Sequence, residues 1–81
     1  SWGELPLIAQ EAINIFNMLG DRIAADIGYL GKDYTNLPIY MEVHGIQDKE
    51  FFLDIINWLD SRAIQQSADA MKREREKLKR K

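Results

Sequence analysis

The chain has no cysteine and only one histidine, His44, and these two shortages narrow the chemistry that it can support. Without cysteine there is no disulfide and no thiolate metal site, and a reducing compartment is the expected environment. A single histidine cannot supply the pair of imidazoles of a conventional zinc site. We therefore interpret His44 as a surface residue and predict neither a metal nor a cofactor.

Long apolar runs are also lacking. No stretch approaches the roughly 18 residues that span a bilayer, and the first ten residues lack the positive segment that opens a signal peptide. The sequence therefore predicts a soluble, intracellular, cytoplasmic protein without membrane contact.

Signatures of catalysis are scarce. The sequence contains no phosphate-binding loop and no nucleophile with a companion base, so we predict no catalytic residue, no small-molecule substrate and no enzyme activity. Asp48, Glu50 and Asp54 lie close together but lack the spacing of a calcium loop, and they suit helix capping. Residues 28–31 (GYLG) match the bare GxxG spacing of RNA-clamping loops, but we interpret both glycines as helix ends.

Helical periodicity is the main positive signal. Apolar residues recur every three or four positions through residues 5–30, among them Ile8, Ala12, Ile15 and Leu19. Gly20 followed by Asp21 indicates a break, which predicts helices over about 5–19 and 21–30.

Turn-forming residues fill positions 31–38, which we predict to be a loop. Residues 39–44 alternate like a strand, yet a lone strand has no partner, so unless a second copy pairs with it we favour a short helix or an irregular segment. Asp48 suits an N-cap, and no proline or glycine follows it, so a long helix is predicted over 48–71 and beyond. The fold class is therefore all-α, with three or four helices and a long C-terminal helix.

Charge divides the chain into two parts. Residues 72–81 hold seven basic and two acidic residues, a net charge of +5, while residues 1–71 hold four basic and eleven acidic residues, a net charge of −7. We predict an acidic helical domain over 1–71 and a basic helical extension over 72–81 that projects as an arm. The basic side chains of this arm are Lys72, Arg73, Arg75, Lys77, Lys79, Arg80 and Lys81.

Both long helices carry more apolar surface than one core face needs, which indicates a surface for a second subunit or a partner helix. Packing within a small helical core is the alternative explanation. The predicted apolar contact residues are Phe16, Phe51, Ile55 and Trp58.

These features predict a non-enzymatic interaction or assembly module, of the scaffold, chaperone or adaptor kind. It would self-associate or dock on a larger protein through its apolar helix faces, while the arm meets an acidic surface. The alternative is a nucleic-acid-binding accessory protein that places the arm on phosphates, although the acidic body opposes such binding.

Overall fold

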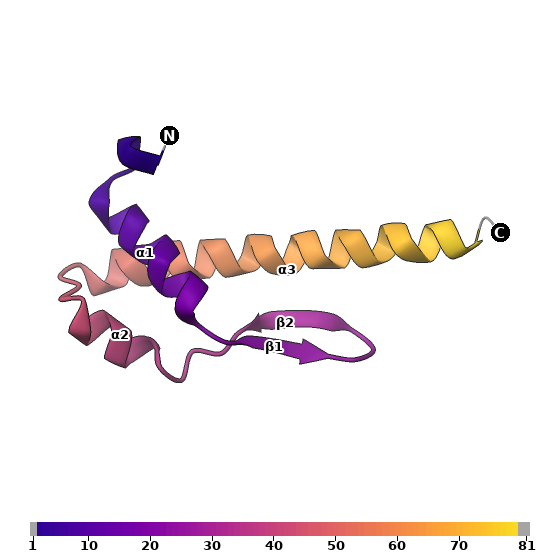
Figure 1. Ribbon diagram of the computed structural model, residues 1–81, viewed down its shortest axis with the longest axis horizontal. Helices are drawn as coiled ribbons and strands as arrows, with labels where there is room; N and C mark the ends of the chain where they lie inside the picture. Colours follow the sequence, from indigo (N-terminus) through magenta and orange to yellow (C-terminus); the bar gives the residue numbers. More distant parts are fainter. Residues whose placement is uncertain (1, 80–81) are drawn as a thin grey trace.

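A computed structural model describes residues 2–79 of the chain as a mostly helical domain with one β-hairpin (Figure 1). Its elements, in chain order, are the 3₁₀ helix η1 (Trp2–Glu4), α1 (Leu7–Met18), β1 (Asp21–Ala24), β2 (Gly28–Lys32), α2 (Leu37–Val43) and α3 (Lys49–Lys79). The molecule measures 52 × 30 × 17 Å, and α3 runs along the longest dimension.

The first helix confirms the prediction for residues 5–19 to within a few residues. α1 starts directly after Pro6, whose missing N–H costs nothing at a helix start, and the carbonyl of Pro6 accepts from the amide of Ala9 at 3.0 Å. Ala12 and Ile15 are the buried side chains of α1. The helix ends at Met18, and Leu19 is already extended, so the chain leaves the helix just before Gly20.

The prediction of a second helix over 21–30 is wrong. These residues form most of an antiparallel hairpin in which Asp21 pairs with Lys32 and Ala24 pairs with Gly28, with an irregularity after Arg22. The fold is therefore not all-α, although three helices make up most of it.

Two glycines explain why this segment is a hairpin. Gly28 and Gly31 have φ angles of +94° and +115°, which lie in the left-handed region that glycine adopts without strain. Gly28 is the first residue of β2 and Gly31 lies within it, so the prediction that they end helices is also wrong. The helix-like spacing of Ile23, Ile27 and Leu30 was misleading, because all three side chains are exposed.

The loop after the hairpin is shorter than the predicted 31–38. The Asp33 carboxylate accepts hydrogen bonds from the Thr35 amide at 2.9 Å and from its hydroxyl at 2.6 Å, a local turn that occupies the loop. α2 then begins at Leu37, with Pro38 in its first turn, so of the structures left open for residues 39–44 the short helix is the one that forms, and it starts earlier. Gly45 follows with a φ of +64° and ends the helix.

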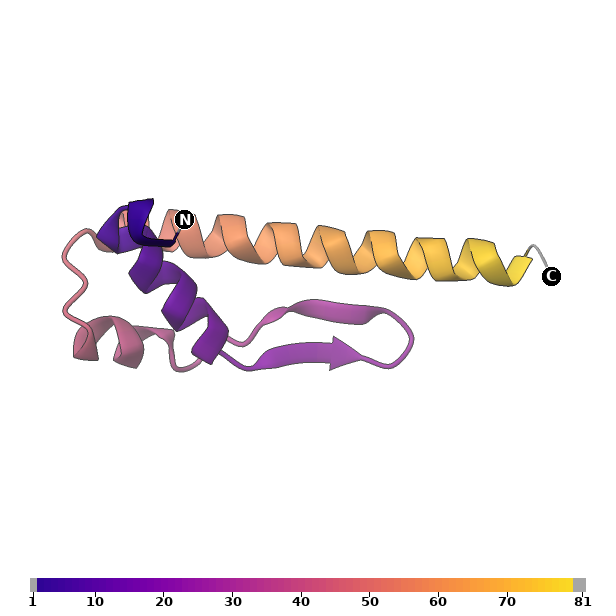
Figure 2. The same cartoon turned by 45° about the horizontal axis from the view of Figure 1, so that its top comes forward.

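α3 is one continuous helix that crosses the predicted boundary between residues 71 and 72. Its start is capped as predicted, because the side chain of Asp48 accepts the amide hydrogen of Phe51 at 3.1 Å. In Figure 2 the hairpin runs beside the middle of α3, and the last turns of the helix extend past the hairpin tip. Within the described residues, the arm is therefore the helical segment 72–79, and Arg80 and Lys81 lie outside it.

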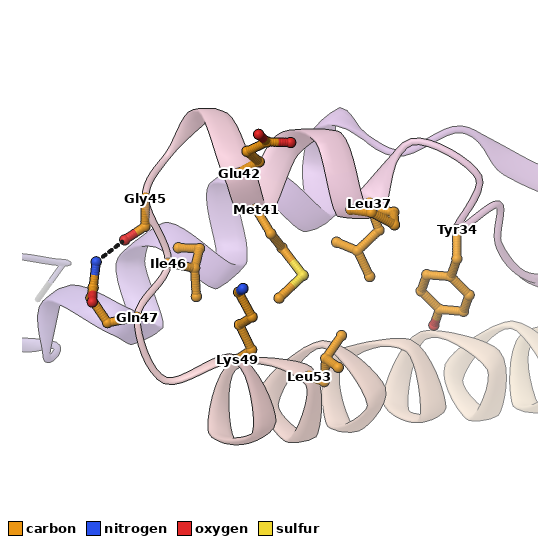
Figure 3. Close-up of a pocket in the computed structure, with 10 residues that line it drawn as sticks. Tyr34, Leu37, Met41, Glu42, Gly45, Ile46, Gln47, Lys49 and Leu53 are labelled. Atoms are coloured by element: carbon orange, nitrogen blue, oxygen red, sulfur yellow. Dashed lines mark hydrogen bonds between the residues drawn. The ribbon is translucent and has the colours of Figure 1, made fainter.

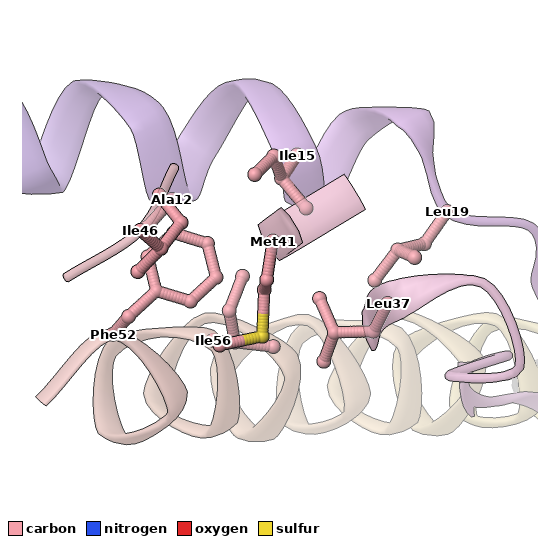
Figure 4. Close-up of a cluster of buried hydrophobic side chains, with 8 residues drawn as sticks. All are labelled: Ala12, Ile15, Leu19, Leu37, Met41, Ile46, Phe52 and Ile56. Carbon is pink, nitrogen blue, oxygen red and sulfur yellow. The ribbon is translucent and has the colours of Figure 1, made fainter. Parts of the chain in front are cut away.

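The core lies where α1 and α2 meet the first half of α3 (Figure 4). Phe52, Ile15 and Ile56 are its largest fully buried side chains, and burying each contributes roughly 1.5 to 3 kcal/mol. The remaining core residues are Ala12, Leu19, Leu37, Met41 and Ile46. This small core fixes one side of the first half of α3.

Candidate interaction surface

A buried carboxylate attaches the hairpin to α3. Asp60 is only 5% exposed and accepts hydrogen bonds from the hydroxyls of Tyr29, at 2.6 Å, and of Tyr34. The backbone amide of Lys32 donates to the same carboxylate at 3.0 Å. Three groups from the hairpin and the following loop therefore meet on one side chain of the long helix.

The ionisation of this cluster follows from its contacts. Burial raises the pKa of Asp60, but the hydrogen bonds from Tyr29, Tyr34 and the Lys32 amide, together with the positive charge of Lys32, lower it below its usual value. Burial, and then the hydrogen bond to Asp60, raises the pKa of each tyrosine hydroxyl. At neutral pH the carboxylate is charged and both hydroxyls keep their protons, which is the state that makes all these bonds.

The hairpin approaches α3 closely at its two glycines, where an added side chain would crowd the helix. A Cβ atom at Gly31 would lie 3.0 Å from the Oδ2 atom of Asp60, and one at Gly28 would lie 2.5 Å from the sulfur of Met71. Packing against α3 thus explains the GxxG pattern. Neither this contact nor the role of Asp60 was predicted from the sequence. A signal was present, since Asp60 follows Phe52 and Ile56 at intervals of four residues.

Phe16, one of the predicted contact residues, is used inside the molecule. It is half-buried against the core, and the Nζ atom of Lys32 lies 4.7 Å from its ring centroid. The same ammonium group binds the carboxylate of Asp21 at 2.8 Å and donates to the carbonyl of Leu19 at 3.2 Å. Phe16 therefore holds the hairpin base to α1 and contributes little free surface.

Phe51 and Trp58 lie apart from this cluster and face solvent. They are 51% and 59% exposed although both are large and aromatic, and Ile55 lies between them, half-buried against the core. The Cζ atom of Arg62 lies 5.0 Å from the centroid of the Trp58 ring, a cation–π contact that leaves much of the ring open. The structure thus brings three of the four predicted contact residues onto one flank of α3.

A groove separates α2 from the start of α3 (Figure 3) and has a volume of about 650 Å³. Leu37, Met41 and Leu53 form apolar walls, while Lys49 and Glu42 stand at the rim. A second hollow of about 440 Å³ lies beside the 44–48 loop, where His44 is an exposed lining residue.

The basic arm is exposed throughout the described residues 72–79. The Nζ atom of Lys77 lies 3.5 Å from the carboxylate of Glu74, an ion pair within the helix. Lys72, Arg73, Arg75 and Lys79 are likewise exposed on the helix. Within that range the arm offers a charged rod without an apolar stripe, since Leu78 is its only large apolar side chain.

Across residues 2–79 no group of three or more acidic or histidine side chains is arranged to hold a metal ion. Among the described helices, none is both long and apolar enough to cross a membrane. Comparisons with family models, with curated proteins and with solved structures gave no match.

Proposed function

We propose that this protein is a non-enzymatic assembly module that associates with copies of itself through the exposed flank of α3. The observation that carries the proposal is the position of Phe51 and Trp58, two large aromatic side chains seven residues apart on the same flank, each more than half exposed. Aromatic residues dominate the binding energy of protein interfaces. Leaving two of them in water on an 81-residue chain favours a surface that a partner covers.

Charge supports a role for the arm in the same assembly. Residues 1–71 carry a net charge of −7 and residues 72–81 a net charge of +5, so one copy attracts the arm of another at low salt. The same imbalance weakens binding to nucleic acid, because the acidic body repels phosphates and only the arm can approach them.

Sedimentation velocity at rising protein concentration tests the proposal. We expect the wild-type chain to form a defined oligomer, and the double variant Phe51→Ser with Trp58→Ser to remain a monomer. The matched control is Ile39→Ser with Val43→Ser on α2, two residues that are 59% and 76% exposed but lie on another element, and it should associate like the wild type.

Two results would contradict the proposal. A wild-type chain that stays monomeric at every concentration would exclude self-association, and an oligomeric double variant would place the contact elsewhere. The same series with a short DNA duplex tests the alternative function. A monomer that shifts only with duplex, only at low salt and only with residues 72–81 present would favour nucleic-acid binding.

A further inference from the structure

Four residues form a continuous line along the first half of α3. Phe51, Ile55, Trp58 and Arg62 follow one another at intervals of four, three and four residues, the spacing of helices that pair with a second helix. All except Ile55 are exposed. We call this line the α3 seam.

The seam lies on the opposite side of α3 from the hairpin. Asp60 contacts Tyr29 of the hairpin, and the side chain of Ile64 lies close to Gly31. Trp58 and Arg62 are each two residues away from Asp60, which at 3.6 residues per turn corresponds to roughly 200° around the helix. A second helix can therefore lie on the seam without meeting the hairpin.

We propose that the seam is covered by the seam of a second copy, with the two α3 helices antiparallel and Ile55 of one copy against Trp58 of the partner subunit. This inference rests on the proposed self-association and adds its geometry. The two helices cross near residues 56 and 57, so that Arg62 reaches Phe51 of the partner subunit at each end of the contact.

Charge selects the antiparallel orientation. Asp54 lies three residues from Phe51, so an antiparallel partner brings its Arg62 beside an acidic side chain. A parallel pair would instead place Arg62 beside Arg62 of the partner subunit. It would also align two arms that each carry a net charge of +3 over residues 72–79.

Apolar burial selects the crossing point. If the helices overlapped along their whole length, Phe51 would face the charged arm of the other copy, and the apolar part of the seam would meet no apolar partner. Burying large apolar side chains contributes several times more than exposed ion pairs do. The short overlap over about residues 51–62 is therefore preferred, and the two arms point away from each other.

The distance between spin labels tests this geometry. Because the chain has no cysteine, Lys72→Cys gives one labelling site, and Lys72 is exposed on the arm. For the proposed crossing, two labels in a dimer lie roughly 45 Å apart along the helices, at 1.5 Å per residue. A parallel pair or a full-length antiparallel pair brings them to about 30 Å or less, and that result would overturn the inference.

A charge exchange provides a second test by sedimentation equilibrium. We expect Arg62→Glu to weaken dimerisation about tenfold and Asp54→Arg in the same chain to restore most of the loss. Lys72→Glu makes the same change of charge on the arm, outside the seam, and Asp54→Arg should restore little of any affinity that it costs. If the second change gives no rescue, Arg62 and Asp54 do not meet between copies and the inference fails. A wild-type monomer would instead refute the proposed function, so the two failures are distinct.

Discussion

The hydroxyl of Tyr29 donates a hydrogen bond of 2.6 Å to the carboxylate of Asp60, a residue 31 positions later in the chain. This bond joins the hairpin to the long helix, and Tyr34 donates to the same carboxylate from the loop that follows. The hairpin has only two strands and exposes Ile23, Ile27 and Leu30, so its stability depends on this attachment more than on its own packing.

Replacing the carboxylate tests the attachment. Asp60→Asn keeps the shape but removes the charge, and one amide oxygen cannot accept all three donors. We expect the free energy of unfolding to fall by about 2 kcal/mol, measured by urea denaturation. Asp69→Asn is the control, because Asp69 is an exposed acceptor on the same helix and should change stability by less than about 0.5 kcal/mol. Equal effects of the two changes would contradict a special role for Asp60.

The pH dependence of stability should carry the signature of Asp60. Its pKa in the folded state lies below the ordinary 3.8, so between the two values the unfolded chain binds more protons. The contribution of Asp60 is therefore fully present well above pH 3.8 and is lost as the pH falls below that value. As the pH falls through the acid range, the urea midpoint of the wild type should approach that of Asp60→Asn. Parallel curves would refute this linkage.

Gly31 should tolerate no side chain. Gly31→Ala places a Cβ atom 3.0 Å from Asp60 at a φ of +115°, so strain and crowding add. We expect a loss of about 2 kcal/mol in thermal or urea unfolding. Gly20→Ala is the matched control, since nothing lies within 4 Å of its added Cβ atom. A harmless Gly31→Ala would mean that the hairpin can shift away from α3.

Ending the chain after Met71 should leave the domain folded. The side chains of residues 72–79 are exposed, so their removal takes away helix but no core. We expect the unfolding free energy to change by less than about 1 kcal/mol, with a smaller far-ultraviolet circular dichroism signal. A collapse of stability would show that the arm packs on the body.

The helices were predictable because their signals are local. α1 and α3 follow from apolar spacing, a proline at one start and Asp48 at the other, and the exposed flank with Phe51 and Trp58 follows from their position beside the buried stripe. The hairpin was not predictable in the same way. Ile23, Ile27 and Leu30 imitate helical spacing, whereas the partner that holds the hairpin is Asp60, far along the chain. A non-local contact leaves no periodic pattern in the segment that it fixes.

The single helix α3 passes through three environments, from the core at Phe52 to the hairpin contact at Asp60 and then to solvent beyond Met71. Its backbone hydrogen bonds follow the same helical pattern throughout. Opening them takes more free energy in the first two environments, because side-chain contacts with the core or the hairpin must be broken as well. Amide protons should therefore exchange slowest near Ile56 and progressively faster towards Lys79. We therefore expect the first half of α3 to stay helical while its last turns open and become accessible to proteases.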